Sequence, residues 1–296
     1  MSKVGFVGLG AMGTAIAGRL LAAGHEVVGT NRNASRAAPL IERGLVWRDS
    51  PREVAEASEV IFSMVTDDAA LKAVTSGGQG IVAGLAPGKI YVDLSTVSPA
   101  ASRRLAERVR ASGADMLDAP VSGSVPAAED GTLSIMVGGA AHTFQAVEPV
   151  LRELGRSVDH VGRNGQGLLL KLAINISLAA QMLAFSEGLL LATRGGVERK
   201  LAVEVMTASA VGSPMLKTRA PLVLDLPEEA WFDVRKMQKD LRLALRTADK
   251  LDVPLPTTAV ADDVLTTARH LGYEHRDIAS LFDVLAQVAR LEPGWM

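Results

Sequence analysis

Over the first half of the chain, short apolar runs alternate with stretches of helical periodicity. The runs have the length of strands that are buried on both faces, and glycine follows several of the helical stretches. Predicted strands occupy residues 4–7, 26–29, 60–65, 90–94, 115–118 and 134–137. Predicted helices occupy residues 12–23, 35–43, 69–75, 100–112 and 142–154. This alternation predicts a parallel sheet with helices on both faces.

After about Gly162 the strand signals stop and the pattern is helical throughout. The predicted helices occupy residues 167–193, 199–209, 234–251, 258–271 and 278–289. We therefore expect an α/β chain with an N-terminal Rossmann-type doubly wound sheet and an all-α C-terminal domain that starts with a long interdomain helix. The predicted domains are residues 1–163 and residues 164–296.

Two apolar segments resemble targeting or membrane signals. The N-terminal run has the position of a signal peptide, but four glycines and Arg19 interrupt it. Residues 168–191 are long enough to span a bilayer. They include Lys171, Asn175, Gln181 and Glu187, whose side chains are costly in lipid. We expect a helix buried within protein, and an integral membrane protein is the alternative.

Composition excludes several classes of protein. The 296 residues are 48% hydrophobic, which excludes intrinsic disorder. The 31 basic and 33 acidic side chains leave a formal charge of −2, which does not favour nucleic acid. The chain has no cysteine, so a disulfide scaffold, a thiolate nucleophile and a cysteine-ligated metal site are excluded. We expect a cytoplasmic protein without a metal and without a nucleic-acid or membrane partner.

A glycine-rich turn joins the first predicted strand to the first predicted helix. Its G-x-G-x-x-G sequence comprises Gly8, Leu9, Gly10, Ala11, Met12 and Gly13. Gly8 permits the tight turn, Gly10 admits a pyrophosphate, and Gly13 allows close packing of helix on strand. The N–H groups at the helix N-terminus then bind the phosphates. This context predicts a nicotinamide dinucleotide site, with FAD or a purely structural turn as alternatives.

The end of the second predicted strand bears on the choice between NAD and NADP. NAD-specific sites place Asp or Glu here to bind the ribose 2′-OH. This chain has Asn31, Arg32 and Asn33 instead, and Arg36 follows. Arg32 can pair with a 2′-phosphate. We expect NADP, with NAD as the second choice, unless Arg32 is only a solvated loop cation.

Polar and small residues follow two later strands, where ligands bind in parallel sheets. The segment 93–99 ends one strand, and its Ser98 is also a good helix N-cap. The segment 118–124 offers the Ser122 hydroxyl and the backbone N–H of Gly123, which suit a small carboxylate. A plain turn is the alternative for this second segment.

Lys171 is the most informative single residue. It lies in an apolar helix that has almost no polar face, and Asn175 projects from the same face one turn later. Burial lowers the pKa of a lysine amine, which favours proton donation near neutral pH. The alternative is an amine that reaches solvent along the helix. Taken alone, Lys239 and Asp240 are interpreted as an exposed charge pair.

These motifs together resemble the β-hydroxyacid dehydrogenase family, of the 3-hydroxyisobutyrate dehydrogenase, tartronate semialdehyde reductase and glyoxylate–succinic semialdehyde reductase type. The chain is also expected to be 6-phosphogluconate dehydrogenase-like. The resemblance covers nearly the whole chain and rests on ordered motifs. They are residues 7–13, 93–96, 118–123 with 131–133, 165–167 with Lys171 and Asn175, and 239–241.

The resemblance implies specific roles for the residues in these motifs. Lys171 would be the catalytic acid/base, and Asn175 would orient the substrate. Ser122 and Gly123 would bind the substrate carboxylate. The residues expected to contact the nicotinamide and its ribose are Met64, Val65 and Thr96, and Lys239 would close over cofactor or substrate.

The chain also departs from the family pattern. Ser124 replaces the second glycine of Ser-Gly-Gly, Ala127-Ala128 after Pro126 replaces Gly-Ala, and Thr66 replaces a common proline. These changes affect the choice of substrate more than the reaction. We assign Ser124 and Asp240 to the substrate-binding set.

The expected function is hydride transfer between NADPH and a small semialdehyde acid or 3-hydroxy acid, with Lys171 as general acid/base. An imine reductase is one alternative, although relatives of that kind commonly replace this lysine with Asp or Tyr. A noncatalytic NADP-binding module is another. The long apolar helix also predicts a homodimer or homotetramer.

Overall fold

The computed structural model describes residues 2–289. Contacts between residues divide the chain between Lys171 and Leu172 into two compact units, which we call the sheet unit and the helical unit. The predicted boundary, between residues 163 and 164, lies in the turn before the long helix, whereas the division by contacts lies within that helix.

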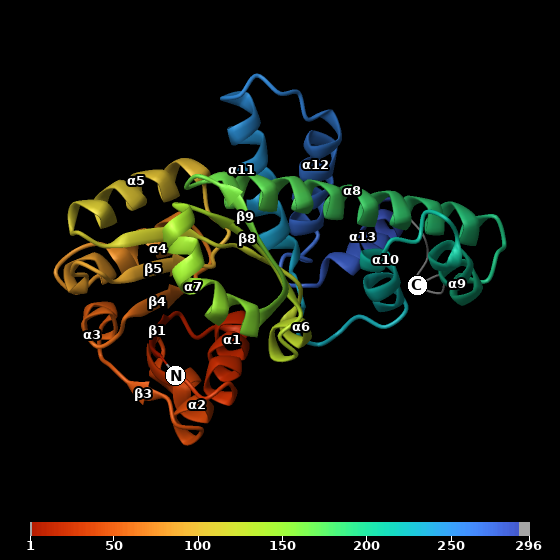
Figure 1. The fold of residues 1–296 in the computed structure, drawn as a ribbon. Helices are drawn as coiled ribbons and strands as arrows, with labels where there is room; N and C mark the ends of the chain where they lie inside the picture. The colour runs from red at the N-terminus through yellow and green to blue at the C-terminus, as the bar shows by residue number, and fades with distance from the viewer. Residues whose placement is uncertain (1, 290–296) are drawn as a thin grey trace. The chain divides into compact units, whose positions relative to one another are not determined.

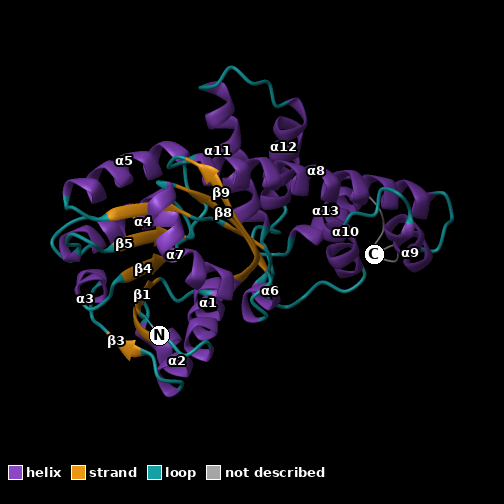
Figure 2. Cartoon of the chain, in the orientation of Figure 1, coloured by secondary structure: helices purple, strands orange, loops and turns teal. Residues whose placement is uncertain are grey.

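Nine strands of the described residues form one sheet in the sheet unit (Figures 1 and 2). They are β1 (Lys3–Val7), β2 (Glu26–Thr30), β3 (Val46–Trp47), β4 (Val60–Ser63), β5 (Ile90–Asp93), β6 (Asp115–Asp118), β7 (Val121–Ser122), β8 (Leu133–Gly138) and β9 (Gly155–Gly162). Their order is β3-β2-β1-β4-β5-β6-β8-β7, with β9 paired to β8. The predicted parallel sheet is confirmed for β1 to β6, and β8 extends it antiparallel to β6 and β7.

Seven α-helices of the described sheet unit connect these strands. They are α1 (Ala11–Ala22), α2 (Ala38–Glu42), α3 (Pro51–Glu56), α4 (Asp68–Thr75), α5 (Pro99–Ala111), α6 (Val125–Glu129) and α7 (Ala141–Leu154). Short 3₁₀ segments precede α2 and β5; they are η1 (Ala34–Ala37) and η2 (Ile81–Gly84). The five predicted helices are all present, and α3 and α6 were not predicted. Three helices begin with a side-chain cap, since Ser50, Asp67 and Ser98 accept hydrogen bonds from the first turns of α3, α4 and α5.

Both faces of the sheet are buried, because successive strand residues point in opposite directions. Phe6 and Phe62 belong to a core that α1 and α7 complete, and their rings stack with centroids 6.2 Å apart. The next residue of β1, Val7, joins Tyr91 in a second core with residues of α3, α4 and α5. The near-continuous apolar runs in the sequence follow from this double burial.

The helical unit contains the remaining helices (Figure 2). They are α8 (Gln166–Arg194), which starts in the sheet unit, α9 (Arg199–Ala208), α10 (Pro214–Arg219), η3 (Ala220–Val223), α11 (Val234–Asp249), α12 (Pro256–His270), η4 (Ile278–Ser280) and α13 (Leu281–Val288). Met182, Leu241 and Phe282 are buried members of their common apolar core. The predicted helices of this half are confirmed, and α10 was not predicted.

By length and composition, α8 is the one described helix that meets the criteria for a membrane span. The core helix of a soluble protein meets the same criteria, and 44% of the most apolar window of α8 is buried in this structure. Its second half and α9 expose apolar side chains, including Leu191, Leu201 and Val205. The burial of α8 within protein and the oligomeric state stay predictions.

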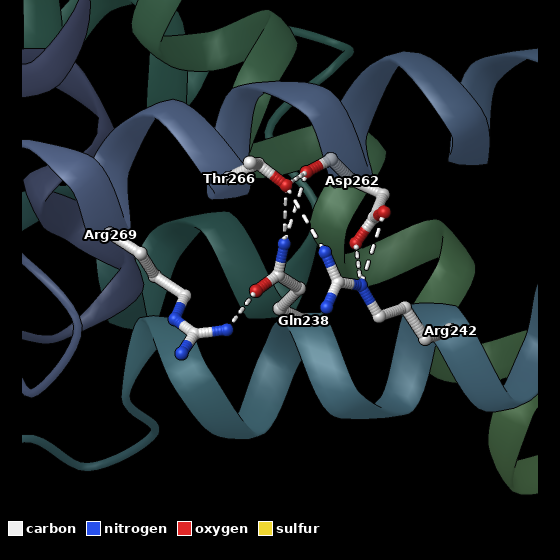
Figure 3. Close-up of polar contacts among 5 residues, drawn as sticks. All are labelled: Gln238, Arg242, Asp262, Thr266 and Arg269. Atoms are coloured by element: carbon white, nitrogen blue, oxygen red, sulfur yellow. Dashed lines mark hydrogen bonds and ion pairs between the residues drawn. The ribbon is translucent and has the colours of Figure 1, made fainter.

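Polar contacts join α11 to α12 (Figure 3). Gln238 donates to the Thr266 hydroxyl at 2.7 Å and accepts from Arg269 at 2.9 Å. Arg242 pairs with the Asp262 carboxylate at 3.0 Å. The Arg242 side chain is 42% exposed, so this ion pair is partly screened by water.

A second ion pair in the helical unit is buried. The Asp277 side chain has no exposed surface and lies 3.3 Å from Arg219 of α10. Its two oxygens also accept from the backbone N–H groups of Phe232 and Ala279, each at 3.0 Å. Burial lowers the pKa of the Arg219 guanidinium, and the facing carboxylate partly offsets this effect.

We expect Asp277→Ala to lower the free energy of unfolding of the helical unit by about 3–5 kcal/mol, because it leaves the Arg219 charge buried without its partner. The matched control is Arg242→Ala, which removes a half-exposed ion pair and should cost no more than about 1 kcal/mol. Denaturant titrations followed by circular dichroism measure both variants. Equal losses of unfolding free energy in the two variants would show that the ion pair of Asp277 with Arg219 stabilises the protein no more than a surface ion pair does.

Candidate active site

The order in which strands are added to the sheet reverses between the parallel neighbours β1 and β4, because β2 and β3 lie on one side and β5 and β6 on the other. At such a switch point the two following loops leave in opposite directions, and a ligand can enter between them. The residues after β1 are the glycine turn, and the residues after β4 are Met64 and Val65. The sheet therefore brings two of the predicted cofactor segments to one edge.

The three glycines of the turn meet different surroundings. Gly8 has a φ of +99°, and a Cβ on it would collide with the Met64 carbonyl oxygen. A Cβ on Gly13 would collide with the Gly8 carbonyl oxygen, so helix α1 packs directly on the turn. Around Gly10, by contrast, no described atom comes within 4 Å of an added Cβ. Gly8 and Gly13 are required by the fold, whereas the space beside Gly10 is open to a ligand.

Gly10 is also the N-cap residue of α1 and has no side chain with which to cap it. The first turn of α1 carries no acidic side chain. The first N–H groups of a helix lack partners within the helix, and the helix dipole there favours an anion. Open space beside uncapped N–H groups fits the pyrophosphate of a dinucleotide.

The residue that follows β2 is hydrogen-bonded to this turn. The Asn31 side chain accepts from the Leu9 N–H at 3.2 Å and donates to the Asn33 carbonyl at 3.0 Å. Asn33 in turn caps η1 by accepting from the Ser35 N–H at 3.1 Å. Arg32, between the two asparagines, is exposed. Asn31 thus holds the loop in place, and Arg32 is left accessible to a ligand.

A chain of buried polar groups supports the loop after β4. The Ser95 hydroxyl accepts from the Val65 N–H at 2.9 Å and donates to the Asp93 carboxylate at 2.6 Å. The Ser63 hydroxyl donates to the same carboxylate oxygen at 2.8 Å. Tyr91 completes the chain at 2.7 Å from Ser63, and burial raises the pKa of its phenol. Thr96 follows directly and is half-buried. Asp93 thereby orients the loop that carries Met64 and Val65.

The predicted carboxylate-binding loop follows β7. Ser122 is the last residue of this strand and pairs with Ser134 of β8. Gly123 has a φ of +140°, and a Cβ on it would approach the Leu133 side chain to 2.7 Å. Ser124 is the N-cap residue of α6, although its side chain makes no capping hydrogen bond. The close packing at Gly123 explains why a larger residue does not occur there.

The start of α8 is held by a carboxylate from the sheet. Asp118, the last residue of β6, is fully buried and accepts from the Gly165 N–H at 2.6 Å and from the Leu168 N–H at 3.1 Å. Burial, assisted by the charge of Asp93, raises the pKa of Asp118 to about 7, although its backbone hydrogen bonds oppose that rise. Lys171 follows one turn later on α8 and is only 8% exposed. Sequence analysis did not give Asp118 a role.

In the helical unit, Asn175 forms part of a buried polar cluster. Its side-chain amide donates to the Asp240 carboxylate at 2.6 Å, and Lys239 pairs with the other oxygen of Asp240 at 2.9 Å. Asn175 is 1% exposed and Asp240 is 2% exposed. The interpretation of Lys239 and Asp240 as an exposed charge pair is therefore wrong for Asp240. Asn175, Lys239 and Asp240 lie together as one cluster.

The site contains residues that could bind a dinucleotide and a residue that could transfer a proton. No group of side chains that could bind a metal occurs in the described part of the chain. Residues 2–289 contain no group of three or more His, Asp or Glu side chains that could hold a metal ion. The strand order and glycine turn define a Rossmann-type dinucleotide-binding domain, joined here to a helical domain.

Comparison with known proteins identifies the family. Residues 3–162 match the NAD binding domain of 6-phosphogluconate dehydrogenase, and residues 165–285 match the NAD-binding domain of NADP-dependent 3-hydroxyisobutyrate dehydrogenase. The chain is 36% identical over 287 residues to 2-hydroxy-3-oxopropionate reductase of Escherichia coli strain K12, covering 97% of this chain and 98% of that protein. The chain belongs to the β-hydroxyacid dehydrogenase family of NAD(P)-binding oxidoreductases.

Two solved structures have folds similar to that of this chain. The structure of Psf3 in complex with NADP+ and 2-OPP has a TM-score of 0.89 and 30% identity, and the match covers 95% of this chain and 99% of that one. An imine reductase from Pseudomonas sp. has a TM-score of 0.64 and 24% identity, with coverages of 96% and 99%. At that level of identity the imine reductase shares the fold, and the likeness carries no statement about activity.

The glycine turn yields a prediction that separates binding from folding. Gly10→Ala should weaken NADPH binding by about 10-fold or more, because its methyl group enters the open space at the N-terminus of α1. The melting temperature should change by no more than about 2 °C, because no described atom opposes that methyl group. Fluorescence titration with NADPH and thermal melts measure the two quantities.

The matched variant is Gly13→Ala, whose methyl group collides with the Gly8 carbonyl oxygen. It should lower both the melting temperature and the affinity for NADPH. If Gly10→Ala binds NADPH as tightly as the wild type does, the pyrophosphate does not pass beside Gly10.

Proposed function

We propose that this chain is an NADPH-dependent reductase that converts a small semialdehyde acid to the corresponding hydroxy acid, and catalyses the reverse oxidation. The proposal depends above all on one observation, the buried residue Lys171 on the first turns of α8, in a chain of this family. The name of the Escherichia coli relative, 2-hydroxy-3-oxopropionate reductase, supports the substrate class.

The residues present fit a bound nicotinamide dinucleotide. The N–H groups of α1 beside Gly10 would hold its pyrophosphate, and the loop of Met64 and Val65, with Thr96, would line the nicotinamide end. When bound in its reduced form, the cofactor supplies a hydride to the carbonyl carbon of the substrate.

Lys171 supplies the proton in this proposal. Its ammonium group donates a proton to the carbonyl oxygen as negative charge develops there, so that the carbonyl becomes a hydroxyl group. The positive charge also stabilises the developing alkoxide, and a site that excludes water strengthens this effect. In the oxidative direction the neutral amine accepts the hydroxyl proton.

The substrate is oriented in this proposal by side-chain polar groups and a backbone N–H. Ser122 and the N–H of Gly123 would bind the carboxylate of the substrate, with Ser124 beside them. The amide of Asn175, which Asp240 holds at 2.6 Å, would contact the reacting end, and Lys239 is anchored to the same carboxylate. A residue set of this kind suits a short acid that carries a carbonyl group.

We expect Lys171→Ala to lower kcat by about 10²–10⁴-fold while NADPH binding stays within about two-fold of the wild type, because general-acid catalysis contributes a factor of that size. Lys200→Ala, which removes an exposed lysine of α9, is the control and should leave kcat unchanged. Steady-state kinetics with short aldehyde acids give kcat. Normal turnover by Lys171→Ala would exclude the proposed role.

The preference for NADPH is assigned to Arg32. The side chain is exposed beside the loop that Asn31 holds against the glycine turn, and no carboxylate occupies positions 31–33 to repel a 2′-phosphate. The NADP+ bound to the related Psf3 structure supports this choice. Arg36 is a second, exposed cation in the same segment.

Arg32→Ala should raise the KM for NADPH by about 10-fold or more, because it removes a charge-assisted contact with the 2′-phosphate. The KM for NADH should stay within about two-fold, since NADH lacks that phosphate. Arg52→Ala, in α3, removes another exposed arginine and serves as the control. An equal rise of both KM values would contradict a contact with the 2′-phosphate.

A further inference from the structure

Asp118 lies at the junction between the sheet and α8. It ends β6 with no exposed surface, and it begins the segment whose later residues, Ser122 and Gly123, are expected to bind substrate. Its own side chain points elsewhere, because both of its carboxylate oxygens accept from N–H groups at the start of α8. Asp118 therefore connects a strand end to the helix that carries Lys171.

The two N–H groups are ones that α8 cannot satisfy itself. Gly165 precedes the helix and Leu168 is its third residue, so neither N–H has a carbonyl one turn earlier within the helix. A local N-cap side chain normally fills this role, but Gly165 has no side chain. The Asp118 carboxylate, 47 residues away in sequence from Gly165, fills it instead. Its negative charge also lies at the favourable end of the helix dipole.

Glycines confine this carboxylate from two sides. A Cβ on Gly138 of β8 would lie 2.8 Å from both Asp118 oxygens. A Cβ on Gly167 of α8 would lie 3.0 Å from one of these oxygens and would collide with the Met136 carbonyl oxygen. The first turn of α8 thus packs directly on the backbone of β6 and β8. The contact fixes the position of the helix as well as capping it.

A capping carboxylate at this depth is energetically costly. Burial raises the pKa of Asp118 to about 7, and Asp93, its partner in register on β5, adds a second negative charge nearby. The basic side chain of Arg103 of α5 lies beside Gly165. A capping side chain at position 165 could accept from the Leu168 N–H without burying a charge. It would not tie α8 to the sheet.

We propose that Asp118 is a positioning residue, whose carboxylate fixes the first turn of α8 on the sheet and so sets the location of the Lys171 amine. This inference rests on the proposed role of Lys171 as general acid/base. Lys171 is three residues beyond Leu168, about 4.5 Å along the helix axis. A displacement of about 1 Å in a catalytic group can cost ~10²-fold in rate, so a loosened first turn reduces proton transfer without touching the glycine turn.

The test compares Asp118→Asn and Asp118→Ala with Asp115→Asn. Asp115 lies at the other end of β6 in a half-exposed pair with His142, so its variant is the control and keeps full kcat. We expect Asp118→Asn to lower kcat by about 10-fold and Asp118→Ala by ~10²-fold, because asparagine keeps one of the two hydrogen bonds. The dissociation constant for NADPH stays within about two-fold in both, and amide hydrogen exchange accelerates at residues 165–168.

Gly167→Ala tests the same geometry with Asp118 intact and covers the case in which Asp118→Ala does not fold. Its methyl group pushes the first turn of α8 away from β8, and the same loss of kcat with normal NADPH binding is expected. Unchanged kcat in variants whose amides 165–168 exchange faster would overturn the proposal. Loss of NADPH affinity in proportion to kcat would also overturn it, because that result indicates general damage to the sheet unit.

A double-mutant cycle separates this proposal from the role of Lys171. If Asp118 acts through Lys171, adding Asp118→Asn to Lys171→Ala causes no further loss of kcat. A full further loss in that background would overturn the positioning role while leaving Lys171 as the general acid. Normal turnover by Lys171→Ala alone would instead overturn the proposed function, and the hydrogen exchange would still report whether Asp118 holds α8.

Discussion

Parallel pairing of the first six strands is the constraint on which the rest of the sheet unit depends. Parallel strands end at the same edge, so the residues after β1, β2, β4 and β5 meet there although they are far apart in sequence. Helices on both faces bury the sheet and leave this edge as the place for polar chemistry. The glycine turn, Asn31 and the loop of Met64 and Val65 occupy it.

Two buried carboxylates at this edge give the site its internal order. Asp93 and Asp118 are register partners on β5 and β6, and each accepts hydrogen bonds from a segment that carries site residues. Asp93 supports the loop after β4, and Asp118 holds the start of α8. Burying two charges close together is unfavourable, and the N–H and O–H donors around them offset that cost. The hydrogen bonds that orient the site residues therefore also contribute to the stability of the sheet.

Much of this fold is predictable because its elements have strong local signals. The helices α1, α4, α5 and α7 follow apolar periodicity and end near glycine or a polar cap, and the central strands are apolar except at their ends. The edge strand β9 was missed because only Gly155 and Val158 of its residues are buried, and polar residues such as Arg156, Asp159 and His160 interrupt any apolar run. Burial of Asp240 was missed for another reason: its partner, Asn175, lies 65 residues earlier in the chain.

The sequence by itself determined the chemistry at single segments: the glycine turn, the cations after β2, the absence of thiols, and a lysine on an apolar helix. These features depend only on the types of residue present and on their spacing over a short stretch of sequence. Only the tertiary structure decided that Asp118 caps α8, that Asn31 holds the glycine turn, and that Asn175 pairs with Asp240. Such contacts join residues distant in sequence, and they form because a buried polar group must find a partner wherever the fold supplies one.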